Sequence, residues 1–138
     1  MIVVLDTNVL LVSLPKGSKF RLIFDAFLQN KYILTLSNEV LSEYVEVIGE
    51  HISHSVASNI AELLTSRDNV RKNDVYFRWN LISADADDNK FTDLFVASNA
   101  DYLVTNDSHF REVSKISFPK INIINVNDFL KLLSENKD

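Results

Sequence analysis

The chain contains no cysteine, and it has only two glycines and two prolines among 138 residues. The lack of cysteine excludes disulfides, zinc–thiolate sites and a thiol nucleophile, and it fits the reducing cytosol. The scarcity of glycine and proline leaves few breaks in regular structure, and 46% of the residues are apolar. A chain of this size and composition can bury a core, so we expect one folded domain over residues 1–138 rather than a disordered chain.

Long hydrophobic runs are absent as well. No apolar stretch approaches the ~20 residues needed to span a bilayer. Met1 leads directly into the apolar run Ile2–Leu5, without the charged segment and cleavage site of a signal peptide. We therefore expect a soluble, cytoplasmic protein with no membrane partner. The net charge of −5 argues against tight nucleic-acid binding through charge alone. It does not exclude an enzyme that contacts nucleic acid briefly, because bound cations offset clustered carboxylates.

Short apolar runs alternate with segments of helical periodicity. In the stretch 67–84, which is harder to interpret, we expect one short strand. We expect Tyr76, Phe77 and Trp79 to pack in the core, in preference to the alternative that they stack on unpaired bases. The alternation implies right-handed βαβ units, and therefore an α/β fold with helices on both faces of a central parallel sheet. We predict strands over 1–5, 32–36, 102–105 and 121–126, and helices over 18–30, 39–48, 53–65, 87–99 and 127–134.

Two aspartates follow predicted strands. Asp6 comes directly after the first strand, and Asp107 follows the strand Tyr102–Thr105 by two residues. Because ligands of parallel sheets bind at the carboxyl ends of the strands, both carboxylates are expected to face that crevice. Carboxylate oxygens are the ligands that hard divalent cations prefer, and two-metal phosphodiester cleavage requires several of them. Two simpler interpretations remain open: Asp6 as a helix N-cap and Asp107 as a turn residue.

A third candidate carboxylate lies in the middle of a predicted helix. Glu43 stands among apolar residues, with Glu39 and Glu46 about one turn away. The simpler interpretation is a solvated acidic face. Like charges at these spacings repel one another slightly, so a metal ion or a basic partner would relieve the repulsion.

The fourth candidate comes from a group of carboxylates at a predicted helix start. Asp85, Asp87 and Asp88 lie there, and at least one of them is expected to stabilise the helix N-terminus through the macrodipole. The residues alone leave open which of Asp85, Asp87 and Asp88 belongs to the site, and Asp93, further along the same predicted helix, is a reserve. His109 lies in a polar turn, where a lone histidine is usually a surface residue.

The order of these signals is more specific than any one of them: strand–Asp, helix–Glu, helix-start Asp, strand–Asp. The segments that carry it are Leu5-Asp6-Thr7-Asn8-Val9-Leu10, Leu36-Ser37 with Leu41-Ser42-Glu43-Tyr44, Trp79-Asn80-Leu81-Ile82 with Asp85-Ala86-Asp87-Asp88-Asn89-Lys90-Phe91, and Ala100-Asp101-Tyr102-Leu103-Val104-Thr105-Asn106-Asp107. Over nearly its whole length the chain resembles the PIN domain family, most closely the bacterial branch that supplies the toxins of toxin–antitoxin systems.

The resemblance implies a PIN-like α/β/α fold and a metal-dependent endoribonuclease that cleaves single-stranded RNA. It implies that Mg²⁺ or Mn²⁺ is bound to activate water, that a cognate antitoxin protein is a partner, and that the chain forms a homodimer. Many relatives carry proline at the position of Ala86, so this approach to the third carboxylate departs from the family pattern. The residues carried over to the catalytic and metal site are Asp6, Glu43, Asp88 and Asp107, with Thr7, Asn8 and Thr105 hydrogen-bonded around them.

Three other interpretations deserve comparison. A phosphatase with an aspartyl nucleophile would need a second aspartate where Asn8 stands, and usually a cap domain. A receiver-type signalling domain would need an acceptor aspartate after its third strand and a late lysine, and neither is evident. A catalytically degenerate PIN-like module that binds nucleic acid or protein is the remaining alternative. The presence of all four expected carboxylates argues against it, and absence of metal binding would revive it.

Overall fold

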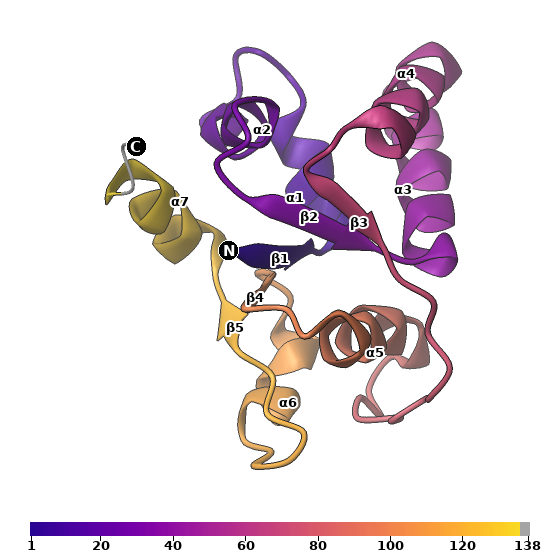
Figure 1. Cartoon of the computed structure of the whole chain (residues 1–138), viewed down its shortest axis with the longest axis vertical. Helices are drawn as coiled ribbons and strands as arrows, with labels where there is room; N and C mark the ends of the chain where they lie inside the picture. The colour runs from indigo at the N-terminus through magenta and orange to yellow at the C-terminus, as the bar shows by residue number, and fades with distance from the viewer. Residues whose placement is uncertain (136–138) are drawn as a thin grey trace.

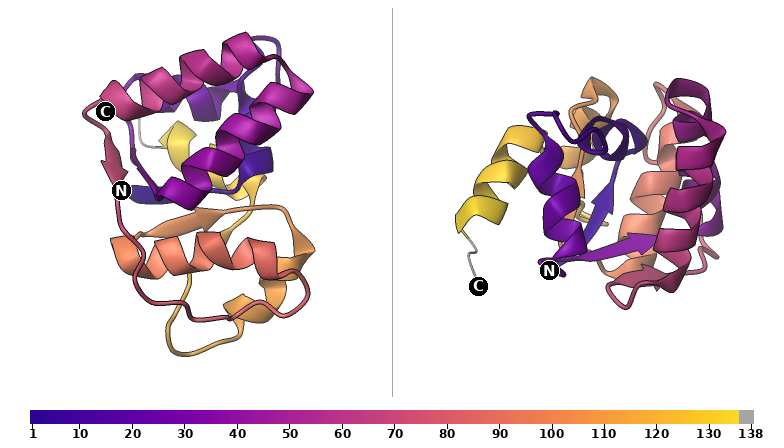
Figure 2. Two further views of the ribbon diagram at one scale, coloured as in Figure 1. Left: turned by 90° about the vertical axis from the view of Figure 1, so that its right-hand side faces the viewer. Right: turned by 90° about the horizontal axis from the view of Figure 1, so that it is seen from above.

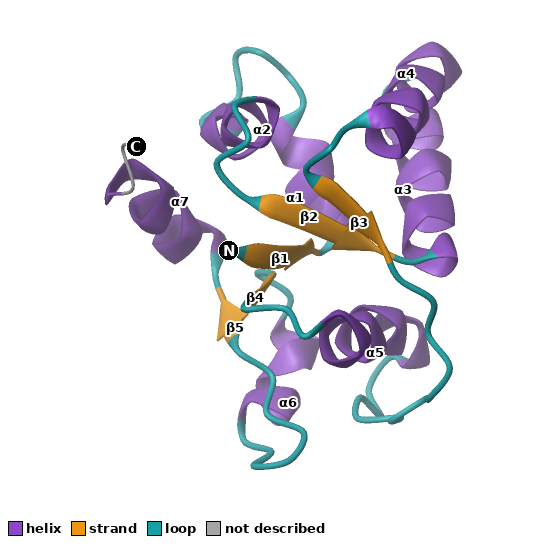
Figure 3. Cartoon of the chain, viewed as in Figure 1, coloured by secondary structure: helices purple, strands orange, loops and turns teal. Residues whose placement is uncertain are grey.

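The computed structural model describes residues 1–135 of the chain, so the last three residues of the predicted domain lie outside the described part. A five-stranded parallel sheet forms the centre, in the order β3-β2-β1-β4-β5 (Figures 1 and 3). The strands are β1 (Ile2–Leu5), β2 (Ile33–Leu36), β3 (Val70–Lys72), β4 (Tyr102–Val104) and β5 (Ile123–Ile124). The helices are α1 (Thr7–Ser13), α2 (Arg21–Leu28), α3 (Asn38–His51), α4 (His54–Ser66), α5 (Asn89–Ser98), α6 (Arg111–Ser114) and α7 (Val126–Glu135), with 3₁₀ turns η1 (Ala86–Asp88) and η2 (Ser108–Phe110).

Helices cover both faces of the sheet. α5 packs against β1, β2 and β4, whereas α1 and α2 lie on the opposite side and α7 packs on α2 (Figures 1 and 2). α3 and α4 form a helical hairpin beside the β2–β3 edge. This arrangement is the three-layer α/β/α fold that the alternation of strands and helices predicts. None of the helices over residues 1–135 is long and apolar enough to cross a bilayer.

Local sequence explains where the helices next to the site begin and end. The Ser37 hydroxyl accepts a hydrogen bond from the Val40 N–H, at 3.2 Å, and so caps the start of α3. α5 ends at Asn99, whose φ of 52° lies in the left-handed region that asparagine tolerates at helix ends. Tyr44 is fully buried, and its hydroxyl donates to the Leu5 carbonyl oxygen. This bond ties α3 to the end of β1.

Several local predictions need correction. α1, η2 and α6 were not predicted as helices, because each is too short to show a periodicity of its own. The prediction that the aromatic residues of 67–84 pack in the core is wrong for Tyr76 and Phe77, whose exposed fractions are 90% and 63%. Trp79 is half-buried and does not belong to the core either. The short strand expected in the same stretch is β3.

Candidate metal centre

One threonine hydroxyl links the carboxyl ends of two neighbouring strands. Asp6 follows β1 and its N–H donates to the carbonyl oxygen of Val104, the last residue of β4, at 3.0 Å. The Thr105 hydroxyl donates to Asp6 Oδ2 at 2.7 Å and accepts from the Asp107 N–H at 3.0 Å. Asp6 occupies the N-cap position of α1, but its side chain makes no capping hydrogen bond. The carboxylate therefore points to the carboxyl ends of β1 and β4 and does not cap the helix.

The environment of the Asp6 carboxyl group disfavours its ionisation. Its residue is only 7% exposed, and burial raises the pKa of Asp6 from 3.8 to about 6. The hydrogen bond from Thr105 lowers this pKa, whereas the nearby charges of Asp88 and Asp107 raise it further. The three carboxylates are thus close enough to repel one another, and a cation between them would relieve that repulsion.

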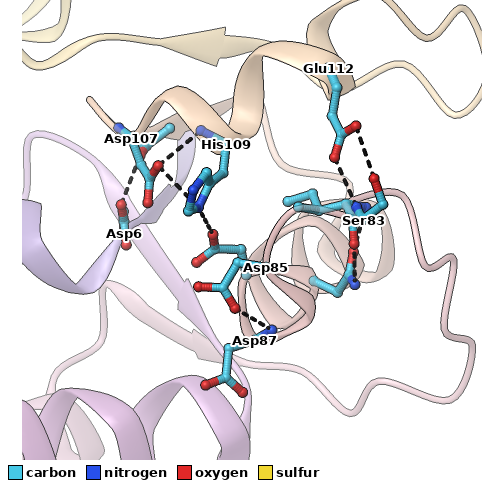
Figure 4. A network of polar contacts seen from close by, with 11 residues as sticks. Asp6, Ser83, Asp85, Asp87, Asp107, His109 and Glu112 are labelled. Carbon is cyan, nitrogen blue, oxygen red and sulfur yellow. Dashed lines mark hydrogen bonds and ion pairs between the residues drawn. The ribbon is translucent and has the colours of Figure 1, made fainter.

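His109 lies beside Asp107 (Figure 4) and also contacts Asp88. Its Nδ1 lies 3.1 Å from Asp88 Oδ2 and 3.4 Å from Asp107 Oδ1, and its backbone N–H donates to Asp107 Oδ1 at 2.9 Å. The hydrogen bond to Asp88, together with the charge of Asp107, raises the pKa of the His109 imidazole. Burial raises the pKa of Asp88, and the Asp107 charge adds to it, although the His109 hydrogen bond opposes both.

Three side chains stand in an arrangement that could hold a divalent cation. One ligand atom each from Asp85, Asp88 and His109 lies within 4.8 Å of the other two. Two carboxylates and an imidazole suit a transition-metal ion such as Mn²⁺, Fe²⁺ or Zn²⁺ better than Mg²⁺, which prefers oxygen donors and water. Asp107 and Asp6 continue the line of carboxylates from this group toward the sheet.

Glu43 reaches the same edge from α3. It accepts a hydrogen bond from the hydroxyl of Thr7, the residue after Asp6, and forms an ion pair with Lys90 Nζ at 2.9 Å. The side chains of Lys90 and Glu43 are only 16% and 23% exposed. Burial alone lowers the pKa of Lys90, but the hydrogen bond and charge of Glu43 outweigh it and raise the pKa. The lysine therefore supplies a fixed positive charge beside the acidic residues.

The family of the chain is decided by a match over its first three quarters. A family model described as PIN domain matches residues 2–109. The chain belongs to the PIN domain family. The resemblance found in the sequence motifs is thereby confirmed. A search of curated proteins found no significant match.

Solved structures show that the PIN fold extends over nearly all of the chain. VapBC2 from Rickettsia felis, bound to a DNA fragment from its promoter, has a TM-score of 0.63 at 19% identity and covers 91% of this chain and 98% of that one. DNA-bound VapBC from Salmonella typhimurium has a TM-score of 0.61 at 16% identity, with the same two coverages of 91% and 98%. Mycobacterium tuberculosis VapC20, a Sarcin-Ricin loop cleaving toxin, has a TM-score of 0.54 at 13% identity and covers 73% of this chain and 86% of that one.

The remaining acidic candidates of this PIN domain serve other contacts. Asp93 is 2% exposed, and its Oδ1 accepts a hydrogen bond from the Trp79 N–H at 2.9 Å. Burial raises the pKa of Asp93, and the bond from Trp79 opposes that shift. This residue therefore anchors the 73–85 loop on α5. The Asp87 side chain is exposed and lies apart from His109 (Figure 4), while its N–H donates to Asp85 Oδ1 at 3.1 Å.

Sequence reasoning gives little weight to two residues of this centre and does not single out a third. The polar turn around His109 indicates a surface residue, and the sequence leaves Asp85 open. Lys90 is missed altogether, because 47 residues separate it from Glu43 and no local pattern pairs them. A usable signal exists for His109 alone: it lies two residues after Asp107, the spacing at which an aspartate side chain accepts a backbone N–H in an Asx-turn.

Proposed function

We propose that this PIN domain is a metal-dependent endoribonuclease that cleaves single-stranded RNA. The observation that carries the proposal is the convergence of Asp6, Asp88 and Asp107 at the carboxyl edge of β1 and β4, where burial, and in addition the charges of Asp88 and Asp107, raise the pKa of Asp6. PIN domains are generally nucleases, which supports the reaction class. VapC20, a Sarcin-Ricin loop cleaving toxin with the same fold, supports RNA as the substrate class.

The donor chemistry of the centre fits a divalent metal ion. We propose Asp6, Glu43, Asp88 and Asp107 as the catalytic and metal-binding carboxylates, with Asp85 and His109 as further ligand candidates. Bound there, Mg²⁺ or Mn²⁺ would activate water and stabilise the charge that develops on the scissile phosphate.

The chain's own residues prepare this site. The Thr105 hydroxyl fixes the orientation of Asp6, and the His109 backbone N–H fixes that of Asp107. Lys90 holds the Glu43 carboxylate in place, because its ammonium group lies 2.9 Å from Glu43 Oε1 in a largely buried position. A rigid set of ligands raises the rate because little reorganisation is needed when the substrate phosphate arrives.

The VapBC neighbours also support a biological role. Both VapBC structures are toxin–antitoxin complexes bound to DNA. We therefore propose that this chain is the toxin of such a pair and that its partner is an antitoxin protein. The homodimer and the cytoplasmic location implied by the family resemblance stay predictions, and light scattering of the purified chain would test the first.

The test is cleavage of a mixed single-stranded RNA by the wild type and by Asp6→Asn, each with Mg²⁺, Mn²⁺ or EDTA. We expect cleavage by the wild type with a metal, none in EDTA, and none by Asp6→Asn. The matched control is Asp68→Asn, which removes an exposed carboxylate in the α4–β3 connection and is expected to cleave like the wild type. Failure of the folded wild type to cleave RNA or to bind Mn²⁺ would favour the degenerate binding module instead.

A further inference from the structure

A cavity of about 310 Å³ opens beside the carboxylates, on the face formed by α1 and the start of α7. Asp6 and Asp107 form part of its lining, so it is continuous with the candidate metal centre. Its volume is at the lower end of the range for small-molecule pockets, ~300–1,000 Å³. Most of the remaining wall is apolar and comes from Val9, Val12, Phe20 and Val126.

Two side-chain amides line the same cavity. Asn8 is exposed on the first turn of α1 and Asn106 lies between Thr105 and Asp107. Asn106 Oδ1 accepts a hydrogen bond from the Val126 N–H at 3.0 Å, which fixes the side chain and leaves its NH₂ group as the donor. The cavity therefore combines apolar walls with amide groups able to donate and accept hydrogen bonds.

A positive charge lies at the same place. Phe20, one wall of the cavity, carries the Lys19 ammonium 5.0 Å from its ring centroid. A second hollow borders the acidic residues on their α3 side, but the carboxylates of Glu39, Glu43, Glu46 and Asp87 in its lining outnumber its one ammonium group, that of Lys90. A polyanionic strand is repelled by that hollow and attracted to the Lys19 side.

We propose that this cavity is a subsite for one unpaired nucleobase of the RNA strand, next to the scissile phosphate; the proposal rests on the proposed function. A nucleobase has two apolar faces and a polar edge, which match the apolar walls and the amides of Asn8 and Asn106. The Asp6 and Asp107 carboxylates repel a bare phosphate from the cavity itself, and the same carboxylates would hold a cation able to neutralise the adjoining phosphate. The base and the phosphate of one nucleotide thus take adjacent positions.

The variant that tests this subsite is Val12→Phe. Val12 is 38% exposed and lines the cavity, so a larger side chain at this position can enter the cavity from its rim and need not enter the core. The matched control is Ile52→Phe, which enlarges an apolar residue of similar exposure (42%) at the end of α3, outside the cavity lining. Far-UV circular dichroism and Mn²⁺ titration establish first that both variants are folded and bind metal like the wild type.

The first readout is the base preference around the cut sites in a randomised single-stranded RNA pool with Mn²⁺. We expect Val12→Phe to change the preference at one position next to the cut by about fivefold or more, because hydrophobic-pocket contacts discriminate on this scale. Ile52→Phe should keep the wild-type preference. Equal preferences and rates for all three proteins would overturn the subsite and leave the nuclease proposal standing.

The second readout needs no cleavage. A short RNA that carries one 2-aminopurine is titrated with each protein in EDTA, and its fluorescence reports transfer of the base into a pocket. A signal that is seen with the wild type and Ile52→Phe and is lost with Val12→Phe supports the subsite, even if no protein cleaves RNA. The same fluorescence signal from all three proteins, or no signal from any of them, would overturn the nucleobase subsite. A protein partner would then be the remaining candidate to occupy the cavity.

Discussion

Removal of the Asp6 charge is expected to stabilise the metal-free protein at neutral pH while it abolishes activity. The pKa of Asp6 is raised from 3.8 in the unfolded chain to about 6 in the folded protein. Since a tenfold change in an ionisation constant corresponds to about 1.4 kcal/mol, the ionised carboxylate lowers the free energy of unfolding by about 3 kcal/mol. An asparagine side chain has the same shape as aspartate and a carbonyl oxygen that can accept the Thr105 hydrogen bond. Asp6→Asn should therefore recover most of this free energy.

The sign of the pH dependence follows from the direction of the shift. An acidic group whose pKa is raised by folding does not change the free energy of unfolding while it is protonated in both the folded and the unfolded state. The cost grows as pH rises above 3.8 and is complete above about 6. The stability advantage of Asp6→Asn should therefore be about 3 kcal/mol at about pH 7.5 and only about 1 kcal/mol at about pH 4.5.

Urea unfolding in EDTA, followed by far-UV circular dichroism at the two pH values, measures these differences. Asp68→Asn is the control, since an exposed carboxylate should change stability by no more than about 0.5 kcal/mol. Saturating Mn²⁺ should stabilise the wild type, by about 2.7 kcal/mol at 100 times its Kd, and should have much less effect on Asp6→Asn. If Asp6→Asn is no more stable than the wild type at neutral pH, or if the difference does not depend on pH, the reasoning about the cost of burying the Asp6 charge beside two other carboxylates is refuted.

Three further substitutions test the interactions around the site. Lys90→Met should lower the free energy of unfolding in urea by about 1–3 kcal/mol, because it leaves the Glu43 carboxylate without its ion pair. Lys90→Arg should restore most of that stability. Equal stability of Lys90→Met and the wild type would argue against the ion pair. Phe110→Ala should lower the free energy of unfolding by about 3–5 kcal/mol and weaken Mn²⁺ binding in calorimetry, since this fully buried ring anchors the turn that carries Asp107. An unchanged Mn²⁺ affinity would show that the turn keeps its conformation without the ring. Asn69→Ala should lower the free energy of unfolding by about 2–3 kcal/mol, because the buried amide donates to two backbone carbonyl oxygens at 2.8 and 3.1 Å. A loss below about 0.5 kcal/mol would show that these hydrogen bonds contribute little to stability.

The sequence is sufficient to predict the strand that ends at Asp6 and the helix that carries Glu43. A β-branched apolar run ends at Asp6, and Ser37 stands where a helix N-cap is expected before Glu43. Both signals are local, because they depend on periodicity and on a hydroxyl that accepts a backbone N–H. The fold class follows from the alternation of such elements. The same signals cannot show that Tyr44 bonds to the Leu5 carbonyl oxygen and so sets the position of Glu43.

The aromatic residues of the 73–85 loop show where local patterns mislead. Tyr76 and Phe77 were expected in the core because apolar residues alternate there, as in a strand. In the structure polar side chains hold this loop through its backbone: Asp93 accepts the Trp79 N–H and Asn89 accepts the Ile82 N–H. The loop needs no buried aromatic anchor beyond these bonds, so the two rings remain exposed. A sequence pattern cannot report hydrogen bonds that depend on residues of another element.

Strand order explains why the site lies where it does. β1 is flanked by β2 on one side and β4 on the other, so the chain reverses its direction of travel across the sheet between β3 and β4. At such a switch point the connections after two neighbouring strands leave toward opposite faces, and a crevice remains at their carboxyl ends. Asp6 follows β1 and Asp107 follows β4, with the Thr105 hydroxyl between them. Strand ends can be predicted from hydrophobic periodicity, but their order depends on contacts between residues about 100 positions apart, as in the pairing of Val3 with Tyr102. The convergence of these carboxylates is therefore a property of topology, which the ordered PIN motifs indicate and local sequence does not.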